Sequence, residues 1–403
     1  MPDFYIRDDE TNEVIRRDVA GMREFARNFA LSRDVTEFEP LTNGNINSTF
    51  KLYVDGRKPI ILQKINGTVF PKPSEVMENI EKVTEHIRKR AKSVGRNPKR
   101  ATLNIVGTNN GEAYYIDENG DYWRMYESVD NARTYENFDG MEKKEAEKLF
   151  SKAGIGFGRF QRDLLDFDIS KLHTTIPNFH NTPSRFKDFM QAIREDKMGR
   201  YKEVQGNRDH PLIQAIEYIL SREEEMSIIQ KELEEGMLPQ RVAHNDTKIN
   251  NVMVDETTQE AVCVIDLDTV MPDTMLADFG DAIRSGANKL GEETASFDEV
   301  EMDMRLYEAF TEGFLSQVGK NMTPEEKALL HKAPKIYTLE LAMRFLGDYL
   351  NGDIYFGNKT NNPKFNLQRG MVQLKLAQDM ETKEQEMEAI NREILDRGSL
   401  GRE

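Results

Sequence analysis

The fold expected for this chain is decided by the stretch RVAHNDTKINN, from Arg241 to Asn251, and by the apolar run AVCVIDLD, which follows from Ala261 to Asp268. The first stretch has the pattern His-x-Asp-x-x-x-x-Asn, and the second is strand-like and leads into another Asp. This register is typical of a loop that transfers a phosphoryl group. One carboxylate meets the attacking hydroxyl, whereas a carboxamide and a second carboxylate hold Mg²⁺. The pattern therefore predicts phosphoryl-transfer chemistry on a small molecule.

The catalytic roles follow from the chemistry of each side chain. We predict that Asp246 accepts or orients the proton of the substrate hydroxyl and that Asn251 is a Mg²⁺ ligand. Lys248 is expected to neutralise charge on the transferring phosphoryl group. His244 is expected to hold the loop backbone by hydrogen bonds rather than to transfer a proton. An ordinary polar loop often contains the same residue types. Here, however, three positions match the phosphoryl-transfer pattern, and the apolar run that ends in an Asp follows at the expected distance.

The apolar run predicts a buried strand that delivers a metal-binding carboxylate. Asp266 is the predicted metal ligand. Asp268 is included as a second candidate metal ligand. The sequence leaves open whether Asp268 binds metal or forms a local hydrogen bond. The triplet Asp278-Phe279-Gly280 spells a protein-kinase metal motif, but it comes late and lacks a preceding apolar strand. We interpret Asp278 as a structural or substrate-side group.

The segment GNINSTF, from Gly44 to Phe50, lies between two strand-like runs. Its small polar residues predict a hairpin whose backbone N–H groups cover nucleotide phosphates, and a plain Asn-Gly turn is the alternative. The predicted nucleotide-binding residues of this segment are Gly44, Asn45, Asn47 and Thr49.

Lys64 shares one face of the next strand with Ile60 and Leu62, so it needs an anionic partner. A nucleotide phosphate and a Glu of the following helix would supply one. That Glu is Glu78 or Glu81, and Glu78 is included in the predicted nucleotide site.

Length and periodicity predict an α+β chain with two lobes. A chain of 403 residues exceeds what one core usually supports. We predict an N-terminal nucleotide-binding lobe with a small antiparallel sheet over 1–128 and a larger, mainly helical lobe over 129–403. Strands are expected near 35–41, 49–55, 58–65, 103–108, 112–117 and 121–128. Helices are expected near 18–30, 73–93, 141–166, 184–198, 210–235, 300–318, 324–350 and 366–396.

Composition narrows the class of partner. Apolar residues make up 38% and charged residues 31%, which is typical of a soluble globular protein. The net charge of −16 disfavours nucleic-acid binding, where Lys and Arg would dominate. The single Cys263 fits a reducing compartment, and no long apolar run or signal-peptide pattern is present, so a cytoplasmic location and no membrane contact are expected. The acidic C-terminal helix leaves a monomer or a weak homodimer open.

The segment from Glu340 to Phe356 combines Arg344 with aromatic residues, among them Tyr355. Fork-like hydrogen bonds and ring stacking would suit a neutral polyol. From spacing alone, an ordinary helix end with a salt bridge is the favoured interpretation.

Three motifs together resemble the aminoglycoside phosphotransferase and choline kinase superfamily, and within it the N-acetylhexosamine 1-kinases. They are HNDTKINN from His244, VIDLDTVMP from Val264 and GxINxTF from Gly44, and the resemblance runs over roughly residues 35–360. It implies a protein-kinase-like fold and Mg²⁺-dependent phosphorylation by ATP of the anomeric hydroxyl of N-acetylglucosamine or N-acetylgalactosamine, giving the sugar 1-phosphate.

The resemblance also implies residue roles. It places Asp246 as catalytic base beside the sugar, Asn251 and Asp266 at magnesium, and Lys64 at the nucleotide phosphates. Arg344 and Tyr355 match positions that contact sugar in such kinases. The resemblance therefore favours a sugar-binding role for this segment over an ordinary helix end. The alternatives are a kinase of another small alcohol, of the aminoglycoside, choline or homoserine type, and a nucleotide-binding pseudokinase.

Overall fold

The computed structural model describes residues 4–7, 14–17, 19–41, 46–56, 58–358, 360 and 362–400. The chain packs into two units, each of which is described by itself. Unit 1 consists of Met1–Arg133, Asp166–Ile176 and Met253–Met271. Unit 2 consists of Thr134–Leu165, Pro177–Val252 and Pro272–Glu403. The α+β class is confirmed, because unit 1 holds an antiparallel sheet and unit 2 is mainly helical. The lobe boundary after residue 128 stays a prediction.

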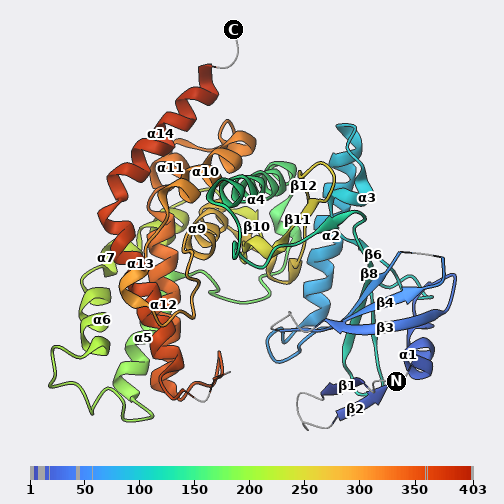
Figure 1. Ribbon diagram of the computed structural model, residues 1–403, viewed down its shortest axis with the longest axis horizontal. Helices are drawn as coiled ribbons and strands as arrows, with labels where there is room; N and C mark the ends of the chain where they lie inside the picture. Colours follow the sequence, from blue (N-terminus) through green and yellow to red (C-terminus); the bar gives the residue numbers. More distant parts are fainter. Residues whose placement is uncertain are drawn as a thin grey trace. The chain divides into compact units, whose positions relative to one another are not determined.

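The main sheet of unit 1 has the order β3-β4-β5-β8-β6, with β7 also paired to β8, and every pair is antiparallel (Figure 1). Burial alternates along β5 as the sequence predicted, because Ile60, Leu62 and Lys64 lie on one face and are the buried positions. The register sets Lys64 opposite Ser48 on β4 and Trp123 on β8. The strands are β3 (Val35–Leu41), β4 (Ser48–Val54), β5 (Ile60–Lys64), β6 (Asn104–Ile105), β7 (Tyr114–Ile116) and β8 (Tyr122–Glu127).

Helix α1 (Val19–Ala26) covers this sheet through an aromatic core. Phe25 contacts Trp123 edge to face, with ring centroids 4.8 Å apart, and Phe50 lies 6.4 Å from the same indole. These rings belong to a cluster of buried apolar residues that includes Met22 and Leu62. The apolar positions at helical spacing in the sequence are therefore the residues that attach α1 to the sheet.

Helix α2 (Pro73–Ser93) ties together the separate chain segments of unit 1. It begins with Pro73, which is favoured in the first turn because its missing N–H has no partner there. Its buried Asn79 donates to the carbonyl oxygens of His173, at 2.8 Å, and Val270, at 2.9 Å. The remaining elements of this unit are β1 (Phe4–Arg7), β2 (Val14–Arg17), α3 (Pro98–Ala101), β9 (Ala132–Arg133), η1 (Ile169–Lys171), β11 (Val252–Asp255), β12 (Ala261–Val264) and η3 (Leu267–Thr269).

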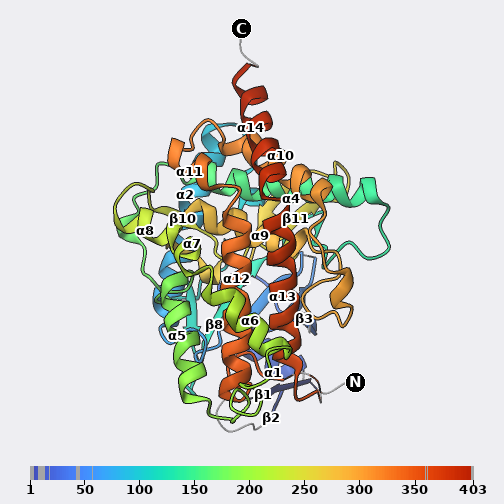
Figure 2. The same ribbon diagram turned by 90° about the vertical axis from the view of Figure 1, so that its left-hand side faces the viewer.

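Unit 2 is built around long packed helices, and α12 and α13 run beside each other (Figure 2). Its elements are α4 (Lys143–Asp163), α5 (Thr182–Glu195), α6 (Pro211–Leu220), α7 (Glu223–Met226), α8 (Ile228–Glu234), β10 (Arg241–Ala243), η2 (Ile249–Asn251), β13 (Met271–Asp273), α9 (Met275–Gly286), η4 (Phe297–Glu299), α10 (Met304–Val318), α11 (Pro324–Leu329), α12 (Ala333–Asn351), α13 (Phe365–Thr382) and α14 (Glu384–Leu400).

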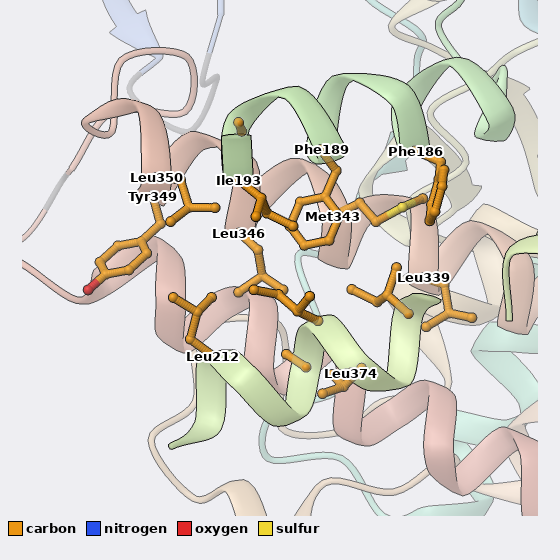
Figure 3. Packing of buried hydrophobic residues seen from close by; sticks show 14 of the residues in the cluster. Phe186, Phe189, Ile193, Leu212, Leu339, Met343, Leu346, Tyr349, Leu350 and Leu374 are labelled. Carbon is orange, nitrogen blue, oxygen red and sulfur yellow. The ribbon is translucent and has the colours of Figure 1, made fainter. Parts of the chain in front are cut away.

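One apolar cluster joins α5, α6, α12 and α13 (Figure 3). Phe189 of α5 and Leu346 of α12 are almost fully buried, and Leu212 of α6 and Leu374 of α13 face them from the other side. Burying a side chain of this size contributes about 1.5–3 kcal/mol, so this cluster stabilises the packing of α12 against the other three helices.

Three helices expected from the sequence were too long. The segment 210–235 divides into α6, α7 and α8, and 324–350 divides into α11 and α12. Pro334 in the first turn of α12 explains the second break, because a proline in a helix interior loses a backbone hydrogen bond and clashes with the preceding turn. The segment 366–396 divides near Lys383, where the amino group binds Asp379 and the carbonyl oxygen of Met302.

Within the residues that the structure describes, no helix is both long enough and apolar enough to cross a membrane.

Candidate active site

The loop after β10 carries the residues predicted to be catalytic, and it is a tight, buried turn. Asn245 has a φ of 66°, in the left-handed region that few residues other than glycine adopt, although Asn tolerates it better than most. Asn245 and His244 are almost completely buried. Such a turn needs partners for its backbone N–H groups, and helix α9 supplies them.

Asp278, on α9, fixes the first half of the loop. Its carboxylate accepts the backbone N–H of His244 at 2.9 Å and of Asn245 at 2.8 Å, and the side-chain amide of Gln161 at 2.5 Å. Burial raises the pKa of Asp278, and these hydrogen bonds oppose that effect. Of the two roles predicted for Asp278, structural and substrate-side, these contacts favour the structural one.

Asp281, one turn further along α9, fixes the second half. It accepts the backbone N–H of Thr247 at 2.9 Å and forms a two-nitrogen ion pair with Arg284, at 3.0 and 2.7 Å. Burial alone would raise the pKa of Asp281, but the charges of Arg284, His180 and Lys248 lower it to about 2. Sequence reasoning missed this residue. The signal was its spacing of one helical turn from Asp278, which puts both carboxylates on one face.

The predicted base, Asp246, is held by two neighbours of the same loop. Its Oδ1 lies 2.8 Å from the amino group of Lys248, and Asn251 donates to its Oδ2 at 3.3 Å. The side chain of Asp246 is 26% exposed, so the carboxylate is oriented and still reachable. The attraction of Asp246 raises the pKa of Lys248, which therefore stays charged.

Asn251 also donates to the backbone carbonyl of Asp246 at 2.8 Å. The amide nitrogen is thus used inside the loop, and the metal role predicted for Asn251 would fall to its carboxamide oxygen and stays a prediction. His244 accepts the N–H of Asp246 through Nδ1 at 3.3 Å, and its ring packs between Phe157 and Phe160. This is the backbone-holding role expected for His244.

The predicted phosphate-binding segment lies in unit 1, and two of its residues, Gly44 and Asn45, fall outside the described part of the chain. Asn47 donates to Asp268 at 2.5 Å and accepts the N–H of Asn66 at 3.0 Å. The hydroxyl of Thr49 donates to the carbonyl oxygen of Asn47 at 3.4 Å. The structure thus connects Asn47 with Asp268, and the contact of these residues with a nucleotide stays a prediction.

Lys64 is a buried cation, as its position on an apolar strand face predicted. Its side chain is 2% exposed, and its amino group lies 2.9 Å from Asp121, an acid that sequence reasoning did not single out. Glu78 forms an ion pair with Lys82, at 3.2 Å, and its carboxylate lies 2.8 Å from Nε2 of His173. The roles of Lys64 and Glu78 at a nucleotide stay predictions.

The two aspartates after β12 have different surroundings. Asp266 has a φ of 60° and begins the turn η3, two residues after the strand ends. Asp268 is buried, where it forms an ion pair with Arg124 and accepts from Asn47. Arg124 was also missed, although it shares a strand face with Tyr122 and Tyr126, and a cation on such a face is the kind of signal that identified Lys64.

The metal role of both aspartates stays a prediction. The described ranges contain no group of three or more His, Cys, Asp and Glu residues that would hold a metal ion by themselves.

Arg344 and Tyr355, the predicted substrate-binding pair, are brought together in unit 2. The guanidinium of Arg344 donates to the Tyr355 hydroxyl at 3.3 Å and lies 5.3 Å from the ring of Phe179 and 5.4 Å from that of Phe356. Asp348 positions the loop by accepting the N–H groups of Tyr355 and Phe356 at 2.8 and 2.9 Å. Tyr355 remains 65% exposed, so its ring is available to a ligand.

The chain belongs to the phosphotransferase enzyme family, whose profile matches residues 37–299.

Solved structures with a similar fold include three kinases. An aminoglycoside phosphotransferase from Alicyclobacillus acidocaldarius subsp. acidocaldarius DSM 446 is 14% identical, with a TM-score of 0.55 over 92% of this chain and 95% of that one. A microcompartment-associated aminopropanol kinase is 15% identical, with a TM-score of 0.54 over 92% and 98%. An amicoumacin kinase in complex with AMP-PNP and Ca²⁺ is 12% identical, with a TM-score of 0.54 over 97% and 94%. At these identities the likeness establishes the fold, and it confirms the predicted kinase-like plan.

Proposed function

We propose that this protein transfers the terminal phosphoryl group of ATP to a hydroxyl of a small molecule, and specifically to the anomeric hydroxyl of an N-acetylhexosamine. The observation that carries the proposal is the environment of Asp246. Its carboxylate is partly exposed, is held by Lys248 and Asn251, and lies on a loop anchored by two buried aspartates of α9. This arrangement suits a base that must be aligned with an attacking hydroxyl.

The reaction would be a direct in-line transfer without a covalent intermediate. Asp246 aligns the sugar hydroxyl and takes its proton, and Lys248 offsets negative charge near the transferring group. A phosphoryl transfer requires little covalent chemistry from the protein, so positioning and charge stabilisation supply most of the rate gain. A rigid loop is therefore a functional requirement.

The residues proposed for nucleotide and metal are suited to that chemistry. Mg²⁺ prefers carboxylate, carboxamide and phosphate oxygens, and when bound it neutralises the charge of the phosphates. Asn251 presents its carboxamide oxygen because its nitrogen is used within the loop, and Asp266 supplies a carboxylate. Asp268 stays a proposed ligand whose oxygens already accept from Arg124 and Asn47. Lys64 would hold the phosphates.

The surroundings of Arg344 support a neutral sugar as the acceptor. Its guanidinium lies near three aromatic rings, and burial together with the charge of Arg344 lowers the pKa of the neighbouring Arg185. Two adjacent guanidinium groups would repel a cationic aminoglycoside or choline. The hydroxyls and the acetamide carbonyl of an N-acetylhexosamine could accept hydrogen bonds from Arg344, and the sugar ring could stack on Tyr355.

The test is phosphorus NMR of reactions with Mg²⁺ and ATP, offering N-acetylglucosamine, N-acetylgalactosamine, choline and kanamycin in parallel. We expect a sugar 1-phosphate signal that is absent with Asp246→Asn. Transfer to choline or kanamycin alone would reject the hexosamine and retain a small-alcohol kinase. ATP binding without transfer to any acceptor would favour a pseudokinase.

A further inference from the structure

A buried histidine contacts the catalytic loop at the residue before Asp246. His180 lies just before α5, and its Nδ1 is 2.9 Å from Oε1 of Glu340 on α12. Its Nε2 is 3.1 Å from the backbone carbonyl oxygen of Asn245. The side chains of His180 and Glu340 are only 7% and 2% exposed.

The chemistry of these two contacts determines the protonation of the ring. A backbone carbonyl only accepts hydrogen bonds, and an ionised carboxylate only accepts them too. Both ring nitrogens must therefore donate, and only the imidazolium form of His180 can do so. Burial raises the pKa of Glu340, but the charge and hydrogen bond of His180 lower it, and the net shift is downward. Arg344, one turn further along α12, and the Thr182 hydroxyl, which donates to Oε2 at 2.7 Å, add to the lowering, so Glu340 stays ionised.

We propose that His180 and Glu340 form an ion pair that positions the catalytic loop: the imidazolium holds the carbonyl of Asn245 and thereby fixes the direction of the Asp246 carboxylate. This inference rests on the proposed function and assigns His180 as a positioning residue, because it acts through Asn245.

The backbone of Asn245 shows why such a restraint is needed. A residue other than glycine in the left-handed region costs about 1–3 kcal/mol and persists only where its surroundings hold it. The N–H of Asn245 donates to Asp278 on one side, and its carbonyl accepts from His180 on the other. Without the imidazolium, the peptide group between Asn245 and Asp246 can turn, and Asp246 turns with it.

The charged groups around His180 set the pH range of this restraint. Burial lowers the pKa of His180, but Glu340 raises it, with Asp273 of β13 and Asp281 of α9 adding to the effect, so that it reaches about 9. The ring of Tyr337 on α12 also faces it, with centroids 5.1 Å apart. The folded-state pKa of His180 is raised, so the imidazolium persists until the pH approaches about 9. The stability that the ion pair contributes is fully present below the ordinary pKa of about 6.5 and is lost as the pH rises through about 9.

The kinetic test compares three variants over an alkaline pH range. We expect His180→Gln to lower kcat about 10- to 100-fold, with the KM values for Mg²⁺-ATP and acceptor nearly unchanged, because misplacement of a reacting group by about 1 Å can cost a hundredfold. Glu340→Gln should move the alkaline limb of kcat toward neutral pH, because the charge that keeps the imidazolium protonated is gone. Glu340→Asp, which keeps the charge, should restore the limb in part.

His86→Gln is the matched control. It removes another histidine–carboxylate pair, His86 with Asp166 at 2.9 Å, which is exposed and lies in unit 1. It should leave kcat and its pH profile unchanged. An alkaline limb that stays in place in Glu340→Gln would overturn the proposal, and so would equal losses in the control and in His180→Gln.

A second readout does not need turnover. Proton–nitrogen NMR of the imidazole nitrogens in the wild-type protein, assigned by loss of one signal in His180→Gln, should show His180 doubly protonated until about pH 9. Titration of His180 near its ordinary value of about 6.5 would contradict the ion pair. An imidazolium at alkaline pH in a protein that phosphorylates no acceptor would instead contradict the proposed function and, with it, the positioning role.

Discussion

Asp246, the proposed catalytic base, lies on a loop whose backbone is held largely by hydrogen bonds of the neighbouring residues. The N–H groups of His244, Asn245 and Thr247 donate to carboxylates of α9. The Asp246 side chain contacts its loop neighbours Lys248 and Asn251. The backbone is thus fixed by groups outside the reaction, and one carboxylate remains partly exposed for chemistry.

Asp246→Asn is the substitution that tests this residue most directly. The amide has nearly the same shape, but it cannot accept a proton, so we expect turnover to fall about 10²- to 10⁴-fold. The affinity for Mg²⁺-ATP should hardly change, because Lys64 and the other proposed nucleotide residues are intact. Turnover can be followed through ADP release and affinity by calorimetry. Near wild-type turnover would remove Asp246 from the mechanism.

At this scale, the sequence selects candidate reactive residues, but it does not identify the groups that hold them. The spacing around Asp246 and Asn251 was sufficient to select them, because the chemistry demands both within one short loop. The sequence left open whether Asp278 is a structural or a substrate-side group, since a carboxylate can accept hydrogen bonds from backbone N–H groups or from a ligand. Burial against the loop decides between the two.

At the scale of elements, the contact between α4 and α10 depends on glycines. A methyl group added at Gly154 would lie 2.3 Å from the carbonyl oxygen of Phe310, and one at Gly313 would lie 2.2 Å from that of Ser151. Side chains larger than hydrogen would therefore separate the two backbones. Gln161, which supports Asp278, lies on the same helix α4, so this contact also supports the loop indirectly.

We expect Gly154→Ala to lower the free energy of unfolding by about 1–3 kcal/mol, because overpacking forces the helices apart. Gly206→Ala is the control, since a methyl group there meets nothing within 4 Å. Urea unfolding of both variants gives the comparison. Equal midpoints for the two would show that the helices adjust without cost.

Element types were largely predictable, and helix ends were less so. Helix α2 was predicted with its observed bounds because Pro73 marks its start and its apolar residues repeat at helical spacing. The division of 324–350 could have been found from Pro334. The division near Lys383 has no glycine or proline beside it, so only tertiary contacts mark it.

At the scale of the whole molecule, the proposed functions divide between the two units. Lys64 belongs to unit 1, whereas Asp246 and Arg344 belong to unit 2. The buried Lys64–Asp121 pair and the aromatic surroundings of Arg344 are built by separate sets of elements. A substitution in one set of elements should therefore affect the binding of one substrate, either ATP or the acceptor.

This division predicts that two substitutions each raise the KM of a different substrate. Lys64→Met should raise the KM for ATP about tenfold or more, because a charge-assisted bond to phosphate is worth roughly 1.5–3 kcal/mol, and should leave the acceptor KM nearly unchanged. Arg344→Ala should raise the acceptor KM and leave ATP binding intact. Steady-state kinetics with each substrate varied in turn, together with thermal unfolding of both variants, makes the measurement. Parallel changes in both KM values would reject the division.

The sequence by itself determined the phosphotransferase class and the α+β plan, and it selected the residues proposed to be catalytic. These features depend on local spacing, because a loop, a helix face or a strand face places side chains from nearby positions together. Family membership and the kinase-like fold agree with that reading.

Only the tertiary structure decided which distant groups meet. Asp121 beside Lys64, Arg124 beside Asp268, and Glu340 beside His180 are pairs formed by packing, and the last joins positions 160 residues apart. No local propensity specifies such a pair. A buried charge requires a partner, but which partner arrives depends on how the helices and strands pack around it.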